Sequence, residues 1–184
     1  MADSIQTLFD SLSAQVCASR PPVHLWHPQR NGSIDIRIAA DGNWFHEGVL
    51  IKRPEIVRLF STILRKDDDG IVLVTPAERL LITVEDTPFV VVDMEHRGSA
   101  SELELLFVTN VQELVVASQT NRLHIDGSPD QPKPVLDVRD GLTGRLIRPL
   151  YYRLVDLALR IGQQNNGRLT ITSRGERFDL GPVA

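Results

Sequence analysis

The stretch Leu50-Ile-Lys-Arg-Pro-Glu-Ile-Val-Arg-Leu-Phe-Ser-Thr-Ile-Leu-Arg65 decides the fold, because its pattern occurs a second time in the chain. The second copy is Leu146-Ile-Arg-Pro-Leu-Tyr-Tyr-Arg-Leu-Val-Asp-Leu-Ala-Leu-Arg160. An Arg-Pro pair stands near the start of each copy, and a glycine turn followed by an apolar strand comes after each one. The shared unit is therefore predicted to be helix, turn, strand, turn and strand, used twice.

Both copies carry the apolar face of a helix, since their apolar residues recur at spacings of three and four. Proline at the first helical position suits both helix starts, because the N–H that it lacks has no partner there. The predicted inward residues are Ile56, Val57, Leu59, Phe60, Ile63 and Leu64 in the first helix and Tyr151, Leu154, Val155, Ala158 and Ile161 in the second.

Length and composition indicate an ordinary globular chain of 184 residues, 42% hydrophobic and 24% charged. A unit of ~60 residues buries only about 60% of its unfolded surface, whereas ~150 residues bury nearly 70%. Two half-size copies would therefore gain by sharing a core. We predict an α+β, internally duplicated, two-part fold of antiparallel sheets, each with a packed helix. The predicted parts are an N-terminal helix (1–22), a first half (23–97) and a second half (98–184).

Charge and apolar patterning exclude several classes of partner. The net charge of −4 argues against nucleic acid, which needs a basic surface. No apolar run reaches the ~18 to 20 residues that span a membrane, and the N-terminus lacks a signal-peptide pattern, so we expect a cytoplasmic protein without a membrane partner. The single Cys17 excludes a multi-cysteine zinc site, and His24 and His27 lack a third ligand nearby. Neither a metal nor a cofactor is expected.

The rest of the chain is mostly predicted as strands. An amphipathic helix is predicted before them, from the spacing of Ile5, Leu8, Phe9, Leu12 and Val16. Residues 34–38 and 44–51 are predicted as a hairpin around Asp41-Gly42-Asn43, and Thr75-Pro-Ala-Glu78 has the form of a capping box that starts a single helical turn. Further strands are predicted at residues 71–74, 80–84, 89–92, 102–109, 113–117, 122–125 and 135–139, with one clear loop at 126–134.

The second strand of the predicted hairpin places Trp44, His46 and Gly48 on one face, because side chains alternate along a strand. If that face is open to solvent, the indole and the imidazole could hold a ligand by stacking and hydrogen bonding. The alternative is a covered face whose histidine is satisfied internally. The sequence leaves both interpretations open.

Arginine at both helix starts breaks a local rule. An N-cap residue normally accepts hydrogen bonds from free N–H groups, whereas Arg53 and Arg148 add positive charge at the positive end of each helix. Together with the free N–H groups, such an arginine suits a carboxylate or a phosphate. The alternative is internal pairing with Glu85, Asp86, Asp137 or Asp140.

Several ordered motifs resemble one bacterial family, that of domain of unknown function 1285, over roughly residues 22 to 180. The motifs are Trp44 to His46 with Gly48, Arg53-Pro54 with Leu59-Phe60, Thr75-Pro76 with Glu78, Val84-Glu-Asp with Pro88-Phe89, Thr109-Asn110, and Arg139 with Gly141-Leu142. The resemblance implies a two-part α+β protein with internal duplication, whose C-terminal half is pleckstrin-homology-like. It implies no established activity, only a proposed ligand or signalling role where the halves meet.

Two functions from different classes follow. The first is a non-catalytic protein that binds a small anionic ligand or a protein partner at the junction of the halves. The second is an enzyme with His46 and Glu85 or Asp86 as acid and base groups in the same cleft. The chain has no phosphate-binding glycine loop, no His-Glu-x-x-His and no nucleophile elbow, which favours the first. The candidate site residues are Trp44, His46, Arg53, Glu85, Asp86, Thr109, Asn110, Arg139 and Arg148.

Overall fold

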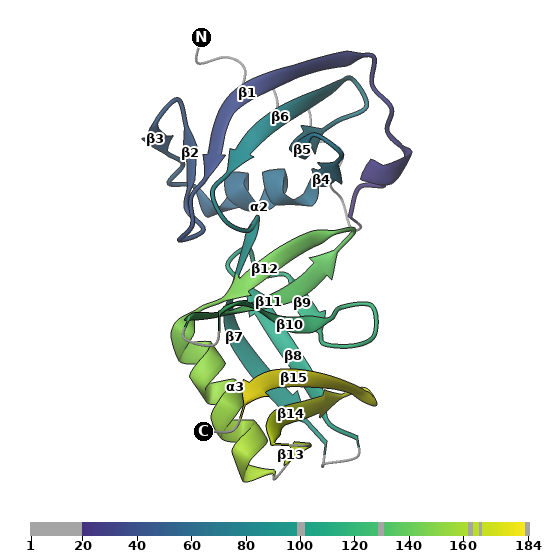
Figure 1. Cartoon of the computed structure of the whole chain (residues 1–184). Coiled ribbons are helices and arrows are strands. Elements are labelled where there is room, and N and C mark those ends of the chain that lie inside the picture. The colour runs from purple at the N-terminus through teal and green to yellow at the C-terminus, as the bar shows by residue number, and fades with distance from the viewer. Residues whose placement is uncertain (1–19, 99–101, 129–130, 162–163, 166, 183–184) are drawn as a thin grey trace. The chain divides into compact units, whose positions relative to one another are not determined.

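The computed structural model describes residues 20–98, 102–128, 131–161, 164–165 and 167–182 (Figure 1). Almost all of the predicted N-terminal helix lies outside the described residues. The chain forms two compact units, Met1–Pro88 and Phe89–Ala184. The boundary thus lies at Pro88, whereas the sequence pattern suggested residue 97. The strand between the observed and the predicted boundary, β7 (Phe89–Arg97), pairs with strands of the second unit.

The N-terminal unit is one six-stranded sheet with a helix, and its strand order is β3-β2-β1-β6-β5-β4. All neighbours are antiparallel except β1 and β6, which run parallel. The elements are the 3-10 helix η1 (Val23–Leu25), β1 (Arg30–Ile38), β2 (Trp44–His46), β3 (Val49–Leu50), α2 (Pro54–Thr62), β4 (Leu64–Asp67), β5 (Gly70–Val74) and β6 (Glu78–Val84).

The C-terminal unit has a six-stranded sheet of order β10-β11-β12-β7-β8-β9 and a three-stranded sheet of order β13-β14-β15. One pair of the larger sheet, β12 and β7, is parallel. After β7 come β8 (Glu104–Thr109), β9 (Leu114–Val116), β10 (Leu123–Ser128), β11 (Gln131–Arg139), β12 (Leu142–Leu146), α3 (Arg148–Arg160), β13 (Gln164–Asn165), β14 (Arg168–Ser173) and β15 (Glu176–Pro182).

The predicted duplication is confirmed: each unit contains a six-stranded sheet, and each helix is followed by three strands. The strands after the helices are used differently. Those after α2 complete the six-stranded sheet, whereas those after α3 form a sheet of their own. Sequence repetition therefore predicted the order of the elements but not the sheet to which they belong.

The helices bury the apolar faces that the sequence indicates. Ile56, Leu59 and Phe60 are buried in α2, and Leu154, Leu157 and Ala158 in α3. Helix α2 ends at Thr62, because the chain turns there and Leu64 pairs with Leu73 in β4 and β5. The prediction that Leu64 belongs to the helix was wrong. No helix of the described residues is both long and apolar enough to cross a membrane.

Two local predictions about turns need correction. The strand predicted at residues 44–51 is interrupted at Glu47 and Gly48, whose positive φ angles of 47° and 76° make a tight turn between β2 and β3. Thr75 does accept the N–H groups of Ala77 and Glu78, but the chain then enters β6 instead of a helical turn.

The predicted loop at residues 126–134 is mostly paired, because β10 and β11 continue into it. Asp126, Gly127 and Ser128 lie opposite Lys133, Pro132 and Gln131. Prolines are normally excluded from the interior of a sheet because they cannot donate to the ladder. Here they lie outside the stretch of β11 that pairs with β12, which starts at Val135. One side of β11 is therefore unpaired only at residues 131–134, where the prolines lie, and the sheet is not broken.

Candidate functional site

The candidate residues of the N-terminal unit lie on both faces of its sheet. Ile36 is opposite His46, Arg37 opposite Phe45 and Ile38 opposite Trp44. Since side chains alternate, Trp44 and His46 share one face, and Arg37 and Phe45 share the other. The Arg37 guanidinium carbon lies 4.3 Å from the centre of the Phe45 ring, as this register requires.

Glu85 lies with Arg37 and not with His46. Its carboxylate accepts from the Arg37 guanidinium and, at 2.9 Å, from the backbone N–H of Ala40. The Ala40 N–H first, and the Arg37 side chain second, hold the pKa of Glu85 below its usual value, which makes it a weaker base. The structure therefore does not bring His46 and Glu85 together as an acid and base pair. Asp86 is exposed.

Trp44 is almost completely buried, with 1% of its surface exposed. Its indole N–H has no hydrogen-bond partner in the described part of the chain, so the surrounding packing offsets the penalty of burying it. His46 is half-buried. Of the two interpretations of this face, the covered one applies to Trp44, because its side chain is not open to solvent.

Three candidates of the C-terminal unit meet around one turn. Thr109 ends β8 and is buried, and its hydroxyl accepts from the N–H of Glu113 at 3.0 Å. Asn110 accepts from the Val90 N–H at 3.0 Å and donates its own backbone N–H to the Val90 carbonyl at 2.7 Å. These contacts fasten the turn after β8 to β7. Both residues therefore have structural roles.

Arg139 joins the same cluster from β11. Its Nε donates to Glu113 Oε1 at 3.2 Å, and the two side chains are only 7% and 14% exposed. The guanidinium also lies 5.0 Å from the centre of the Phe89 ring. Glu113 was not predicted as a site residue. Nothing local in the sequence indicates a pair that joins a strand residue to a turn residue 26 positions away.

The two helix-start arginines behave differently from Arg139. Arg53 is the N-cap of α2, whereas Arg148 is the first helical residue of α3, whose N-cap is Ile147. Both are exposed, and neither side chain has a hydrogen-bond or ion-pair partner among the residues that the structure describes. Internal pairing with Glu85, Asp86, Asp137 or Asp140 is therefore not observed.

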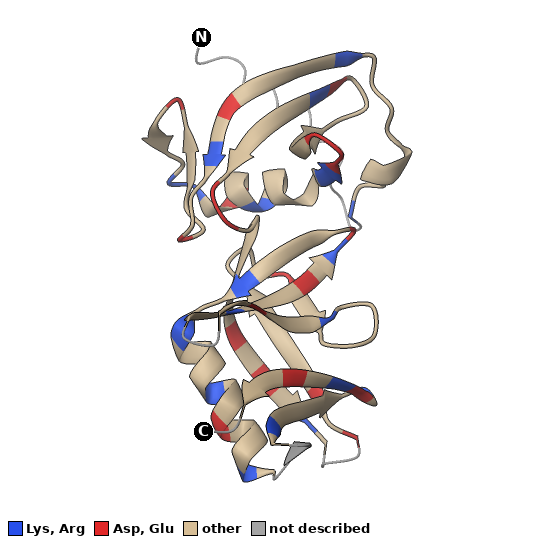
Figure 2. Cartoon of the chain, viewed as in Figure 1, with Lys and Arg blue, Asp and Glu red and all other residues tan. Residues whose placement is uncertain are grey.

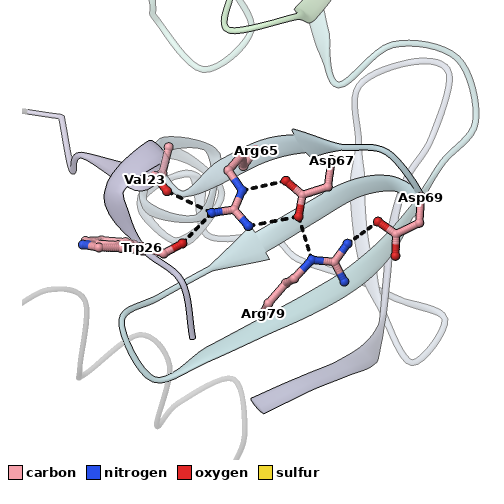
Figure 3. A network of polar contacts seen from close by, with 6 residues as sticks. All are labelled: Val23, Trp26, Arg65, Asp67, Asp69 and Arg79. Atoms are coloured by element: carbon pink, nitrogen blue, oxygen red, sulfur yellow. Dashed lines mark hydrogen bonds and ion pairs between the residues drawn. The ribbon is translucent and has the colours of Figure 1, made fainter. Parts of the chain in front are cut away.

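A network that the sequence analysis missed ties the N-terminal unit together (Figure 3). Asp67 accepts from Arg65 at 2.6 and 2.9 Å and from Arg79 at 2.6 Å. Arg65 also donates to the carbonyls of Val23 (3.0 Å) and Trp26 (2.7 Å). Arg65 and Asp67 are two apart on one strand and so share a face, a spacing that could have revealed the pair. The network holds the segment around η1 against β4.

The two histidines near the start of the chain do not form part of a larger group of metal-ligating side chains in the described residues. His24 and His27 are both exposed, and within the described ranges no three histidine, cysteine or acidic side chains gather as a metal site requires. The described candidates thus comprise a structural cluster around Arg139, a paired Glu85 and two unpaired arginines.

Comparison with known proteins agrees with a protein of two sheet-rich units. The family model described as "Domain of unknown function (DUF1285), N-terminal domain" matches residues 21–87, and "Protein of unknown function (DUF1285), C-terminal domain" matches residues 88–180. The chain belongs to the DUF1285 family, as its motifs predicted. The family boundary lies within one residue of that between the compact units.

Solved structures give the same result. A DUF1285 family protein from Silicibacter pomeroyi DSS-3 is 40% identical, with a TM-score of 0.86 over 100% of this chain and 97% of that one. Another from Shewanella baltica OS155 is 28% identical, with a TM-score of 0.53 over 67% of this chain and 91% of that one. A search of the curated proteins found no match.

Proposed function

We propose that this protein is a non-catalytic binding protein whose ligand carries a carboxylate or a phosphate, held at the start of α3. The observation that carries the proposal is the state of Arg148. Its guanidinium is exposed, and neither this group nor its backbone N–H has a partner in the described part of the chain. Both groups are donors at the positive end of a helix.

The other arginines of α3 make Arg148 distinct. Arg153 donates to Asp93 at 2.7 Å and to the Met94 carbonyl at 3.0 Å, and Arg160 donates to the Asp156 carbonyl. The first turn of α3 contains no acidic residue, so nothing there offsets the positive charge. Figure 2 shows basic residues in blue at both ends of this helix.

An apolar surface adjoins the same helix start. Tyr152 follows Arg148 by one turn, and 57% of its surface is exposed. A helical side chain leans toward the helix N-terminus, so the ring extends in the direction of Arg148. A ligand with an anionic group and a flat apolar part would suit these two side chains.

The start of α2 is the weaker candidate. Arg53 is unpaired there too, but Glu55 in the first turn already supplies the negative charge that the helix end favours. A small anion bound to the free N–H groups of this first turn would be repelled by Glu55. We therefore assign the small anionic ligand to Arg148 and not to Arg53.

Titration of the full chain with inorganic phosphate, citrate and adenosine monophosphate, followed by the amide signals of α3, tests the proposal. Arg148→Gln should weaken binding about tenfold or more, because a hydrogen bond to a charged group contributes about 1.5 to 3 kcal/mol. The matched control is Arg160→Gln, which removes the same charge from the other end of the helix. Equal losses in both variants, or no binding of any probe, would contradict the proposal.

A binding protein of this kind would suit a role in bacterial signalling. That role, a cytoplasmic location and the pleckstrin-homology-like character of the C-terminal unit stay predictions. No described contact favours the enzyme alternative, because Glu85 is engaged by Arg37 on the face opposite His46.

A further inference from the structure

We propose that the free edge of β3, in the N-terminal unit, binds an extended acidic segment of a partner protein, which adds a strand to the six-stranded sheet. This interaction uses different residues from the anion site of α3 and does not depend on it. It is inferred from the backbone, the exposed side chains and the charge of residues 49–53.

The two edges of this sheet differ in whether another described segment lies beside them. At the β4 edge, the segment containing η1 lies beside the strand and is held by the Arg65 guanidinium (Figure 3). At the β3 edge, no described segment pairs with the outer side of the strand. Open strand edges offer a row of unpaired backbone groups to another chain.

The backbone of β3 presents such groups at Leu50. Ile51 donates its N–H to the Trp44 carbonyl at 2.8 Å, and Val49 lies opposite His46. In an antiparallel pair, residues that exchange hydrogen bonds alternate with residues whose N–H and C=O point away. Leu50, between the two, therefore directs its N–H and C=O toward the free edge. The tight turn at Glu47 and Gly48 fixes this direction.

The side chains of the same edge are apolar and exposed. Val49 is 68% exposed and Leu50 39%, although both residues are of the kind that sheets normally bury. Charged or proline residues usually protect an edge strand against pairing, but β3 itself has neither. An apolar residue of an added strand could cover each of these two side chains.

Charge selects the partner and its direction. Lys52 and Arg53 lie just after β3 and are exposed, and their side chains have no partner among the described residues. Glu47 lies at the other end of the edge and is also exposed. An added strand is therefore favoured when its acidic residues lie beside Lys52 and Arg53 and its apolar residues beside Val49 and Leu50.

A capped short peptide with two adjacent valines beside two adjacent glutamates is the probe, titrated into the full chain and followed by the amide signals of residues 49–53. The same peptide N-methylated on alternate residues tests the main-chain bonds, and a valine and lysine peptide tests the charge. Arg53→Gln should weaken binding about tenfold, equivalent to losing one charge-assisted hydrogen bond. The matched control is Arg58→Gln, an exposed unpaired arginine of α2 that lies beyond the edge.

Binding of the acidic peptide that fails for both peptide controls and for Val49→Lys, and that survives Arg58→Gln, would establish the proposal. Equal binding of the N-methylated peptide, or equal losses at Arg53 and Arg58, would overturn it. Self-association that Val49→Lys abolishes would assign the edge to a second copy instead. A change in the β3 amide signals on Phe9→Asp would assign it to the chain's own N-terminal residues.

Discussion

Arg139 and Glu113 form a nearly buried ion pair that fastens the end of β11 to the turn after β8, with Arg139 Nε 3.2 Å from Glu113 Oε1. The pair belongs to the C-terminal unit, beside the Phe89 ring. Arg139 belongs to β11, whereas Glu113 lies between β8 and β9, neither of which is a neighbour of β11 in the sheet. Their contact therefore links the two sides of that sheet.

Loss of Arg139 should destabilise the protein strongly, because it leaves the Glu113 carboxylate without its cation at a site with little solvent. For Arg139→Met we expect a loss of about 3 to 5 kcal/mol in the free energy of unfolding, measured by urea denaturation. The double variant with Glu113→Leu should regain most of it. Arg153→Met, which breaks an exposed pair with Asp93, should cost no more than about 1 kcal/mol. A similar loss in both single variants would contradict the assignment.

Asp67→Asn should lower stability at neutral pH, by about 1.5 to 3 kcal/mol for losing hydrogen bonds to charged groups. Arg65 first, and Arg79 after it, hold the pKa of Asp67 below its ordinary 3.8. The folded state thus keeps this carboxylate charged where the unfolded chain begins to protonate. Its contribution is complete above the unfolded pKa and is lost as pH falls through the lower, folded pKa.

The measurement for Asp67 is therefore urea denaturation of wild type and variant at pH 7 and at several values below pH 4. The difference between them should shrink as pH falls. Asp68→Asn, next to it on the exposed turn, should change stability by less than about 0.5 kcal/mol at any of these values. A difference that grows toward acid pH would refute the network's electrostatic role.

Leu154→Ala should cost about 2 to 5 kcal/mol, since Leu154 is fully buried on the inner face of α3 and the change opens a cavity. Leu159 lies on the same helix but is 47% exposed, so Leu159→Ala serves as the control. Thermal and urea unfolding of both variants measure the contrast. Comparable losses of stability in the two variants would mean that the buried face of α3 is not the one that the structure shows.

Gly144→Ala should be destabilising by about 1 to 3 kcal/mol, the usual range for overpacking a core. A Cβ at Gly144 would meet Val91 Cγ2 at 3.1 Å, Phe89 Cβ at 3.2 Å and Val138 Cγ2 at 3.3 Å. At Gly32 in β1 the nearest atom would be 3.6 Å away, so Gly32→Ala should be tolerated. The comparison of their melting temperatures reports how closely β12 approaches β7.

The sequence predicted the elements better than their assembly. Periodicity identified both helices, because burial of one face imposes a spacing on the residues themselves. It could not show that Leu64 leaves α2 for β4, since an apolar residue fits either environment. Nor could it place β13 to β15 in a separate sheet, because the choice of a strand's neighbours depends on distant residues.

For the candidate site, the sequence indicated which residues were unusual but not which residues they contact. The Arg-Pro pair at each helix start drew attention to Arg53 and Arg148, and both side chains are unpaired in the described structure, although Arg148 is the first helical residue and not the N-cap. Thr109, Asn110 and Arg139 proved to stabilise one turn. The sequence analysis assigned no role to Asp67, although this residue binds two arginines. Such ion pairs depend on how the strands are arranged, which the sequence alone does not reveal.

The parallel pairing of β7 with β12 bears on the time course of folding. Phe89 lies opposite Gly144, whereas β7-β8-β9 and β10-β11-β12 are each built from strands that follow one another in the chain. Closing a long loop costs more chain entropy than closing a hairpin, and contacts between distant residues slow folding. We expect the two three-stranded segments to gain order first and their parallel seam last. In pulsed hydrogen exchange during refolding, the amides between β7 and β8 should become protected before those between β12 and β7.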